Sequence, residues 1–291
     1  MKVSYYPGCS LQSTASEYGA STEAVLRALG ITGKELPDWN CCGATSGHAI
    51  YRGLHQALAI RNLLIAEGEG LDLVVPCAAC YNALRSTRQV LAGGDPEALR
   101  LKEETEHLLG RRYQGEVRVL HILEFLAGEE VGALLSARIR VPLAGLKLAS
   151  YYGCLLTRPP RTVSFETNPE QPRLMDDLLS RLGASPVVWS HKTECCGASL
   201  SIPAPEIVCD LVGKIVLAAR RAGADAIVTA CPLCQTNLDG RQPEGEKIPV
   251  FFLTELVGVA LGLNPHKWLR KHLVDARPLL KAHNLITASR A

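Results

Sequence analysis

The stretch Leu-Asp-Leu-Val-Val-Pro-Cys-Ala-Ala-Cys at residues 71–80 joins a short apolar run to two cysteines spaced as Cys-x-x-Cys. Residues 226–234 read Ala-Ile-Val-Thr-Ala-Cys-Pro-Leu-Cys and repeat that order. A short apolar run bounded by a turn signal is typical of a strand buried in a parallel sheet. The two stretches therefore predict two buried strands, each ending where a pair of thiols begins.

Around these stretches, the same motifs occur in the same order in both halves of the chain. A Gly-Cys pair at Cys9 or Cys154 comes first, a Cys-Cys-Gly triplet at Cys41 or Cys195 comes second, and the Cys-x-x-Cys comes last. In both copies 34 residues separate the triplet's second cysteine from the Cys-x-x-Cys. The gap before the triplet holds 31 residues in the first copy and 40 in the second, and we expect the extra residues in the proline-rich stretch 158–172. This self-similarity indicates an internal duplication.

Strand and helix patterns alternate in both copies. Strand patterns cover residues 3–6, 71–75, 146–152 and 226–229, and helical patterns cover 14–29, 47–66, 175–182 and 204–221. The alternation predicts an α/β fold with two pseudo-symmetric halves, each with a small, mostly parallel sheet flanked by helices. Residues 91–145 read as a largely helical connection, with a solvated helix over 97–112. We place the boundary near Gly145, which gives an N-terminal domain of residues 1–145 and a C-terminal domain of residues 146–291.

Ten of the eleven cysteines belong to the two copies, five in each. A Cys-x-x-Cys alone is ambiguous among zinc binding, thiol–disulfide exchange and iron–sulfur ligation. Adjacent cysteines face one centre only where the chain turns sharply, because neighbouring side chains otherwise point apart. Gly43 and Gly197 provide for such a turn and leave space for a bulky cluster, and Gly8 and Gly153 meet the same need for close approach. Five thiolates exceed the four that zinc or a cubane cluster takes, so iron–sulfur ligation is favoured over structural zinc or a thioredoxin-like dithiol.

Composition limits the class of protein. The 291 residues are 47% hydrophobic and 21% charged, which is the globular range, and a net charge of +2 does not call for nucleic acid as a partner. The longest apolar run, residues 251–263, is interrupted by Glu255 and is too short to span a bilayer, so we interpret it as a packing helix. No secretory signal pattern is present. We expect a cytoplasmic protein without a transmembrane segment, associated with a membrane only through its partners.

Five other residues carry weaker expectations. Cys209 lies in an apolar run and is interpreted as a packed core thiol. His191 precedes the second cysteine pair, where it suits a hydrogen bond to a cluster sulfur, but a plain loop histidine is the favoured interpretation. His48 and His55 are expected at the surface, and Trp39 is expected to act as a packing lid.

The complete pattern resembles the CCG-domain family, and the whole chain is similar to the B subunit of heterodisulfide reductase. The resemblance rests on both five-cysteine motifs, on residues 151–160 and 230–235, and on the tail 251–263. In that family each CCG motif carries a noncubane four-iron four-sulfur cluster held by five cysteines, so the resemblance implies two such clusters, one for each predicted domain. The implied ligands are Cys9, Cys41, Cys42, Cys77 and Cys80 for the first cluster and Cys154, Cys195, Cys196, Cys231 and Cys234 for the second.

The resemblance also implies a function. In the family the substrate disulfide lies between the two clusters, each cluster takes one sulfur, and the cluster irons are the catalytic atoms. Electrons arrive from a ferredoxin-like C subunit, which is supplied by a flavin-containing A subunit. The chain is thus expected to be the catalytic subunit of a heterodisulfide reductase-like complex that reduces or forms a disulfide. The alternative is an electron-relay or anchoring subunit of another oxidoreductase complex, such as a succinate or fumarate reductase-like enzyme.

Overall fold

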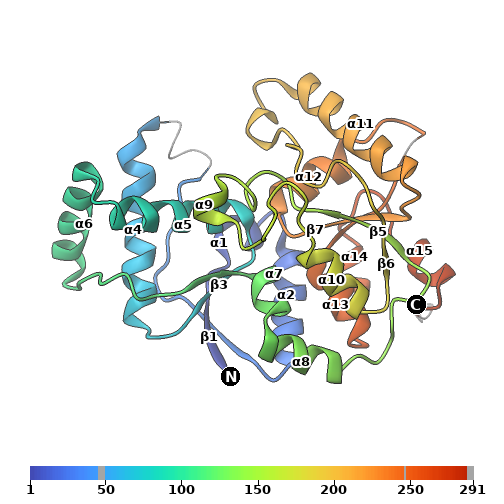
Figure 1. Cartoon of the computed structure of the whole chain (residues 1–291), viewed down its shortest axis with the longest axis horizontal. Coiled ribbons are helices and arrows are strands. Elements are labelled where there is room, and N and C mark those ends of the chain that lie inside the picture. Colours follow the sequence, from blue (N-terminus) through green and yellow to red (C-terminus); the bar gives the residue numbers. More distant parts are fainter. Residues whose placement is uncertain (45–49, 246, 287–291) are drawn as a thin grey trace.

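Two four-stranded parallel sheets organise the chain (Figure 1). The computed structural model describes residues 1–44, 50–245 and 247–286. The first sheet has the order β2-β1-β3-β4 and the second the order β6-β5-β7-β8. The strands are β1 (Lys2–Tyr5), β2 (Thr32–Glu35), β3 (Leu73–Val75), β4 (Val119–His121), β5 (Lys147–Tyr151), β6 (Ser185–Pro186), β7 (Ala226–Thr229) and β8 (Val250–Phe252). The expected α/β fold with two similar parallel sheets is confirmed.

Helices flank both sheets (Figure 1). In chain order they are α1 (Gly8–Leu11), α2 (Ser16–Ala28), α4 (Arg52–Gly68), α5 (Ala78–Ala92), α6 (Pro96–Leu109), α7 (Ile122–Ala127), α8 (Glu129–Ala137), α9 (Pro160–Val163), α10 (Leu174–Arg181), η1 (Ala198–Leu200, a 3-10 turn), α11 (Pro205–Arg221), α12 (Pro232–Gly240), α13 (Leu253–Ala260), α14 (His266–Leu269) and α15 (Arg277–Ala282). The predicted helices over 14–29, 175–182 and 204–221 correspond closely to α2, α10 and α11. Residues 45–49, the start of the predicted helix 47–66, lie outside the described residues.

The central strands show why the apolar runs were informative. Every residue of β3 and of β7 is buried, since helices cover both faces of a parallel sheet and the strand then needs apolar side chains throughout. Gly30 and Gly183 follow α2 and α10 with φ of +67° and +91°, which is the left-handed conformation expected of a glycine beyond a helix end.

Two strands lie where helix was expected. β4 is part of the predicted helical connection 91–145, and it pairs with β3. β8 opens the predicted packing helix 251–263 and pairs with β7, so the helix itself, α13, begins only at Leu253. Three-residue strands are too short to show a period of two, so an apolar run before a helix was assigned to that helix.

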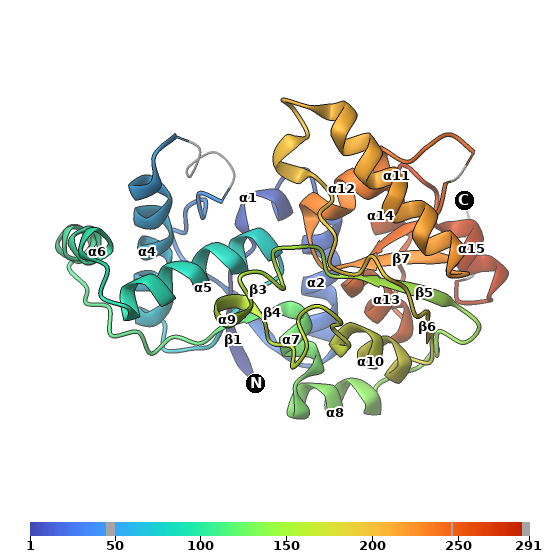
Figure 2. The same cartoon turned by 45° about the horizontal axis from the view of Figure 1, so that its top comes forward.

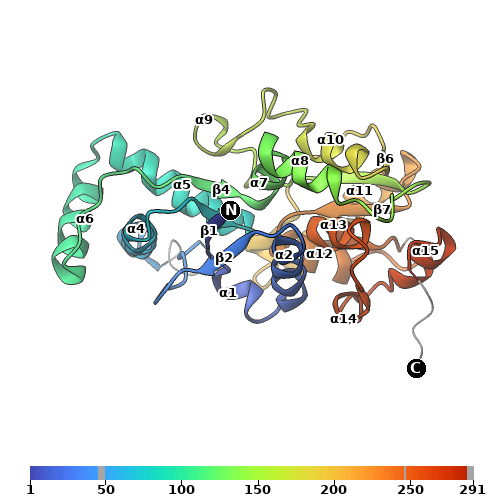
Figure 3. The ribbon, with the colours of Figure 1, turned by 90° about the horizontal axis from the view of Figure 1, so that it is seen from below.

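Helices of each half pack against the other half. α2 follows β1 of the first sheet but packs against α13 and α14 of the second half, and α10 of the second half contacts α7 of the first. Figure 3 shows α2 beside α13, with β1 and β2 on its other side. Within this contact Ser21 Oγ lies 2.6 Å from Thr254 Oγ1, and the Tyr18 ring stacks on Phe252 with centroids 4.2 Å apart. The boundary near Gly145 stays a prediction.

The segment considered for membrane contact lies inside the protein. All eight residues of α13 are buried. Within residues 1–44, 50–245 and 247–286, no helix has both the length and the apolar character needed to span a membrane.

Candidate cluster-binding sites

Both sets of cysteines follow the carboxyl ends of central strands. Cys9 follows β1 and Cys77 follows β3, while Cys154 follows β5 and Cys231 follows β7. Because parallel neighbours end at the same edge of a sheet, the first and last motifs of each copy meet there. Each Cys-Cys-Gly triplet reaches the same edge from the loop before the next long helix.

In the first half the structure brings all five predicted cysteines together. Cys42 Sγ lies 3.3 Å from Cys80 Sγ. Cys42 also shares a hydrogen bond with the Cys41 thiol, and Cys80 shares one with Cys77. Cys9 is near enough to Cys41 to raise the pKa of the Cys41 thiol by electrostatic repulsion, after the larger effects of the Cys42 hydrogen bond and burial.

The second half repeats this arrangement. Cys154 Sγ lies 3.9 Å from Cys195 Sγ, and Cys196 Sγ lies 3.6 Å from Cys234 Sγ. Cys234 also shares a hydrogen bond with the Cys231 thiol. In the described part of the chain, no group of three or more histidine, cysteine, aspartate or glutamate side chains has the geometry to hold a metal ion. The thiols meet in short chains of contacts, in which Cys42, Cys80 and Cys234 each have two thiol neighbours.

Burial divides each set of thiols in the same way. Cys42, Cys77 and Cys80 are buried in the first half, as are Cys196, Cys231 and Cys234 in the second. Cys9 and Cys195 are exposed, whereas Cys41 and Cys154 are half-buried. Each site is therefore closed by protein on its Cys-x-x-Cys side and open to solvent on the side of the other motifs.

The glycine before the first cysteine leaves room for the thiols. A Cβ on Gly8 would lie 2.7 Å from Cys80 Sγ, and a Cβ on Gly153 would lie 3.0 Å from Cys234 Sγ. Both glycines have φ of +67°, a conformation that side chains disfavour. A side chain at either position would enter the space between the thiols. Gly8 and Gly153 therefore permit the close approach of a thiol from the Cys-x-x-Cys motif, as expected of glycines at these positions.

The glycine after each cysteine pair makes the turn and lies against a neighbouring helix. Gly43 and Gly197 both have φ of +74°, which makes the sharp turn that the adjacent cysteines need. A Cβ on Gly43 would lie 3.2 Å from His55 Cα, and one on Gly197 would lie 3.2 Å from Val208 Cγ2. The nearest protein atoms thus belong to α4 and α11, and the expectation that these glycines leave space for a cluster stays a prediction.

A tyrosine hydroxyl anchors each cysteine pair, which the sequence did not reveal. Tyr6 Oη donates to the Asn40 carbonyl at 2.7 Å, and Tyr151 Oη donates to the Glu194 carbonyl at 2.6 Å. Each accepting residue directly precedes a Cys-Cys pair. The repeated Tyr-Tyr dipeptide near each first cysteine was the available signal, but nothing in it specified the partner.

The surroundings favour thiolate at particular positions. The hydrogen bond from the Cys154 thiol lowers the pKa of Cys195 to about 6, and the Gly197 N–H and the Arg158 guanidinium act in the same direction. Hydrogen bonds from Cys41 and Cys80 hold the pKa of Cys42 well below its usual range. Thiolate is the form in which cysteine binds a metal, so these donors favour the ligand form at Cys42 and Cys195.

Two of the secondary expectations are revised, and a third concerns a residue outside the described part of the chain. Cys209 is exposed on α11, because the helical period turns Val208 and Val212 inward and Cys209 outward, so the core-thiol interpretation was wrong. His55 is half-buried beside Gly43, and its charge lowers the pKa of Cys42 after several larger effects, so it is not an ordinary surface residue. His48 lies outside the described residues.

The remaining two residues fit their simpler interpretations. His191 Nδ1 lies 2.8 Å from Ser190 Oγ, which is the contact of a loop histidine. Trp39 packs edge-on against Tyr6 with ring centroids 5.4 Å apart, and its Nε1 donates to Glu35 at 2.8 Å. Trp39 thus covers the anchoring tyrosine of the first site.

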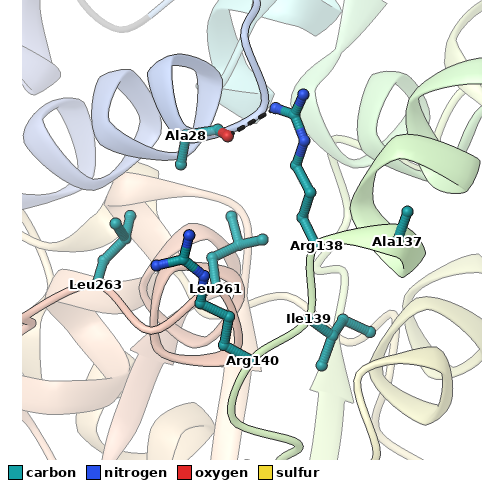
Figure 4. Close-up of a pocket in the computed structure, with 7 residues that line it drawn as sticks. All are labelled: Ala28, Ala137, Arg138, Ile139, Arg140, Leu261 and Leu263. Carbon is teal, nitrogen blue, oxygen red and sulfur yellow. Dashed lines mark hydrogen bonds between the residues drawn. The ribbon is translucent and has the colours of Figure 1, made fainter.

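A cavity of about 510 Å³ opens elsewhere, at the ends of α2, α8 and α13 (Figure 4). Leucine, isoleucine, alanine and two arginines line it, and it contains no cysteine. Arg138 Nη1 donates to the Ala28 carbonyl at 2.8 Å, so this arginine satisfies a carbonyl at the carboxyl end of α2. The cavity is therefore a gap between helix ends, distinct from the thiol sites.

Comparison with known proteins gives three kinds of match. The family model described as "CCG: Cysteine-rich domain" matches residues 3–85 and 148–239. The chain is 31% identical, over 99% of its length and 98% of the relative, to the 8-methylmenaquinol:fumarate reductase membrane anchor subunit of Wolinella succinogenes. It is also 31% identical to the B subunit of the ferredoxin:CoB-CoM heterodisulfide reductase of Methanosarcina mazei, over 91% of this chain and 90% of that protein.

Two further matches extend the comparison. A protein of Archaeoglobus profundus, described as like the B subunit of heterodisulfide reductase, is 29% identical over 92% of this chain and 93% of its own. Among solved structures, a hypothetical protein from Helicobacter pylori matches with a TM-score of 0.72 at 13% identity, over 93% of this chain and 51% of that one. At that identity the structure match shows the fold alone.

Proposed function

The chain belongs to the cysteine-rich CCG family that includes the B subunit of heterodisulfide reductase, and on this premise we propose that it is the catalytic iron–sulfur subunit of a disulfide-reducing or disulfide-forming complex. Membership makes it an iron–sulfur redox subunit of the oxidoreductase class that acts on sulfur groups. The disulfide chemistry, the noncubane type of the clusters and their number are proposals. They rest on the duplicated five-thiol sites.

We assign one noncubane 4Fe-4S cluster to each site. Three observations support the assignment: five thiols in each half, a glycine whose Cβ would collide with a thiol, and hydrogen bonds that favour thiolate. A side chain in place of Gly8 or Gly153 would reach a proposed ligand, Cys80 or Cys234. The proposed ligands are those predicted from the sequence, Cys9, Cys41, Cys42, Cys77 and Cys80 in the first half and Cys154, Cys195, Cys196, Cys231 and Cys234 in the second.

When bound, the clusters supply the two electrons that a disulfide needs to become two thiols, with two protons taken from water. The protein's own residues orient the reaction. The buried Cys-x-x-Cys side keeps water from the sulfurs, while the open side at Cys9 and Cys195 admits a thiol or disulfide. Arg158, whose guanidinium donates to the Thr193 carbonyl at 2.9 Å and pairs with Glu170 at 2.6 Å, orders the loop that leads to Cys195.

The single observation that carries the proposal is the pair of equivalent sites, each open on one side only. Two one-electron centres match the two sulfurs and two electrons of a disulfide. The test is the electron paramagnetic resonance (EPR) spectrum of anaerobically purified protein before and after addition of the CoB-CoM heterodisulfide or 2-mercaptoethanol. We expect the cluster signal to change with either. Cys42→Ala and Cys196→Ala should each remove or convert the cluster of one half, and full iron in the double variant would refute the ligand assignment.

A second function is favoured by one comparison. The relative from Wolinella succinogenes is named a membrane anchor subunit of a fumarate reductase, which suggests an electron relay or an anchoring role. That function predicts clusters whose signal is unchanged by thiols and disulfides. All eight residues of α13 are buried, so this helix offers the alternative no apolar face for membrane contact.

The proposal extends to partners and organisation. We propose a ferredoxin-like C subunit and a flavin-containing A subunit as the source of electrons, a cytoplasmic location, and two CCG domains at residues 1–145 and 146–291. Co-purification of the tagged full-length chain tests the partners. Recovery without any flavin- or iron–sulfur-containing partner would count against them.

A further inference from the structure

The two candidate sites adjoin each other at their buried sides. The hydrogen bond with the Cys234 thiol is the main cause that lowers the pKa of Cys231, and the backbone N–H of Ala78, which directly follows Cys77 in the other half, is near enough to add to that effect. The buried Tyr18 hydroxyl is close enough to both Cys231 and Cys77 to be affected by their charges. The two Cys-x-x-Cys turns therefore face one another across the interface between the halves.

One side chain bridges these two turns. His121 is the last residue of β4 and is fully buried. Figure 2 shows β4 near the middle of the molecule. Its Nε2 lies 2.9 Å from the Pro76 carbonyl and 3.1 Å from the Ala230 carbonyl. Pro76 directly precedes Cys77, and Ala230 directly precedes the first cysteine of the other turn. One imidazole thus contacts the backbone just before both motifs.

The protonation of His121 suits a bridging donor. Its Nδ1 accepts a hydrogen bond from the Leu123 N–H at 3.3 Å, so the proton of the neutral ring resides on Nε2, where both carbonyls accept it. Burial lowers the pKa of His121 to about 4, which keeps the ring neutral near pH 7. The ring is also held by Phe165 of the second half, nearly parallel to it at 6.1 Å.

The other half has no such donor at the equivalent position. His121 lies beside Val75 in the first sheet, and Phe252 lies beside Thr229 in the second. Both residues precede a helix, and in both cases a glutamate three residues on accepts from their backbone N–H. The bridging histidine therefore belongs to the first half alone, and it is not a feature that the two copies share.

We propose that His121 is a positioning residue that fixes the two Cys-x-x-Cys turns against each other, so that the two redox centres act as one coupled pair. The inference rests on the proposed function and goes beyond it, because two clusters in two halves need not be in contact. A fixed spacing between the two turns would let both electrons of a disulfide be delivered from a single unit. The role is one of position, since His121 touches no thiol itself.

The test compares two substitutions in the full-length, anaerobically purified protein. His121→Phe installs the residue found at the equivalent position and removes the donor while keeping a ring for Phe165. His121→Gln keeps an N–H near the place of Nε2. The surface substitution His107→Gln on α6 is the matched control. Iron content and EPR relaxation at graded microwave power are measured for each, with both centres poised in a paramagnetic state.

We expect wild type, His121→Gln and His107→Gln to show fast relaxation of each cluster signal by the other. His121→Phe should lose this mutual relaxation while retaining its iron. Unchanged relaxation in His121→Phe at full iron content would overturn the inference and leave the proposed function intact. Absence of clusters from the wild type would overturn both. If His121→Phe does not fold, unchanged mutual relaxation at full iron content in His121→Ala, which also removes the donor, would equally contradict the bridging role.

Discussion

Replacing Gly8 by alanine separates the cost of a backbone conformation from the need for space between the thiols. Gly8 has φ of +67°, and for a residue with a side chain this left-handed conformation costs about 1–2 kcal/mol. The added Cβ would also lie 2.7 Å from Cys80 Sγ, closer than real Cβ atoms come to a neighbour. Either Cys80 or the start of α1 must move, and both hold proposed ligands of the first site.

Gly70 provides the matched control. Its φ of +65° is nearly the same, but a Cβ there meets nothing within 4 Å. Gly70→Ala therefore carries the same conformational cost of about 1–2 kcal/mol without touching a thiol. Chemical denaturation gives the free energy of unfolding of both variants, and iron analysis gives their cluster content.

We expect both variants to be destabilised, and only Gly8→Ala to lose iron, down to about half of the wild-type content because the second site is untouched. Gly153→Ala should lose the other half, since its Cβ would lie 3.0 Å from Cys234 Sγ. Full iron in Gly8→Ala would refute the claim that a glycine at this position is needed for a cluster in the first site. Equal iron loss in Gly70→Ala would attribute the effect to general destabilisation.

Three further outcomes follow from the structure. Burial opposes the charge on His272, but Glu255 at 2.9 Å outweighs burial and raises the pKa of His272. The stabilisation from this ion pair is therefore complete below the ordinary histidine pKa of about 6.5 and is lost as pH rises through the raised pKa. The free energy of unfolding should fall over this pH range in wild type and fall less in His272→Gln, and equal slopes would contradict this. Cys209→Ser should change stability by less than about 0.5 kcal/mol and keep all iron, because this thiol is exposed; loss of iron would make it a ligand. Tyr6→Phe should cost about 1 kcal/mol by removing the donor to the Asn40 carbonyl, and chelator should then extract iron faster from the first half; unchanged extraction would argue against an anchoring role.

Local patterns in the sequence were sufficient to predict the strands that carry the cysteines. Residues 71–75 and 226–229 are apolar in nearly every position because both faces of a parallel sheet are covered, and this pattern is visible without any structure. The spacing of the ten cysteines predicted their grouping, since each set lies at one sheet edge. Cys209 was misplaced because its apolar neighbours hid the helical period that turns it outward.

What the sequence could not show is contact between distant segments. No local pattern near Ser21 or Thr254 indicates that α2, besides contacting its own sheet, packs on α13 of the other half. His121 was missed for the same reason, because its two acceptors, Pro76 and Ala230, lie 45 and 109 residues away. Such pairings depend on how the halves dock, and a repeat pattern describes each half separately.

The most direct test of the central claim is the iron and acid-labile sulfide content of the full-length chain purified without oxygen, together with zinc analysis of the same sample. Two four-iron clusters predict about eight iron and about eight sulfide per chain. Cys42→Ala should lower both by about half, as should Cys196→Ala. A chain that carries stoichiometric zinc with little iron or sulfide would contradict the assignment of both sites.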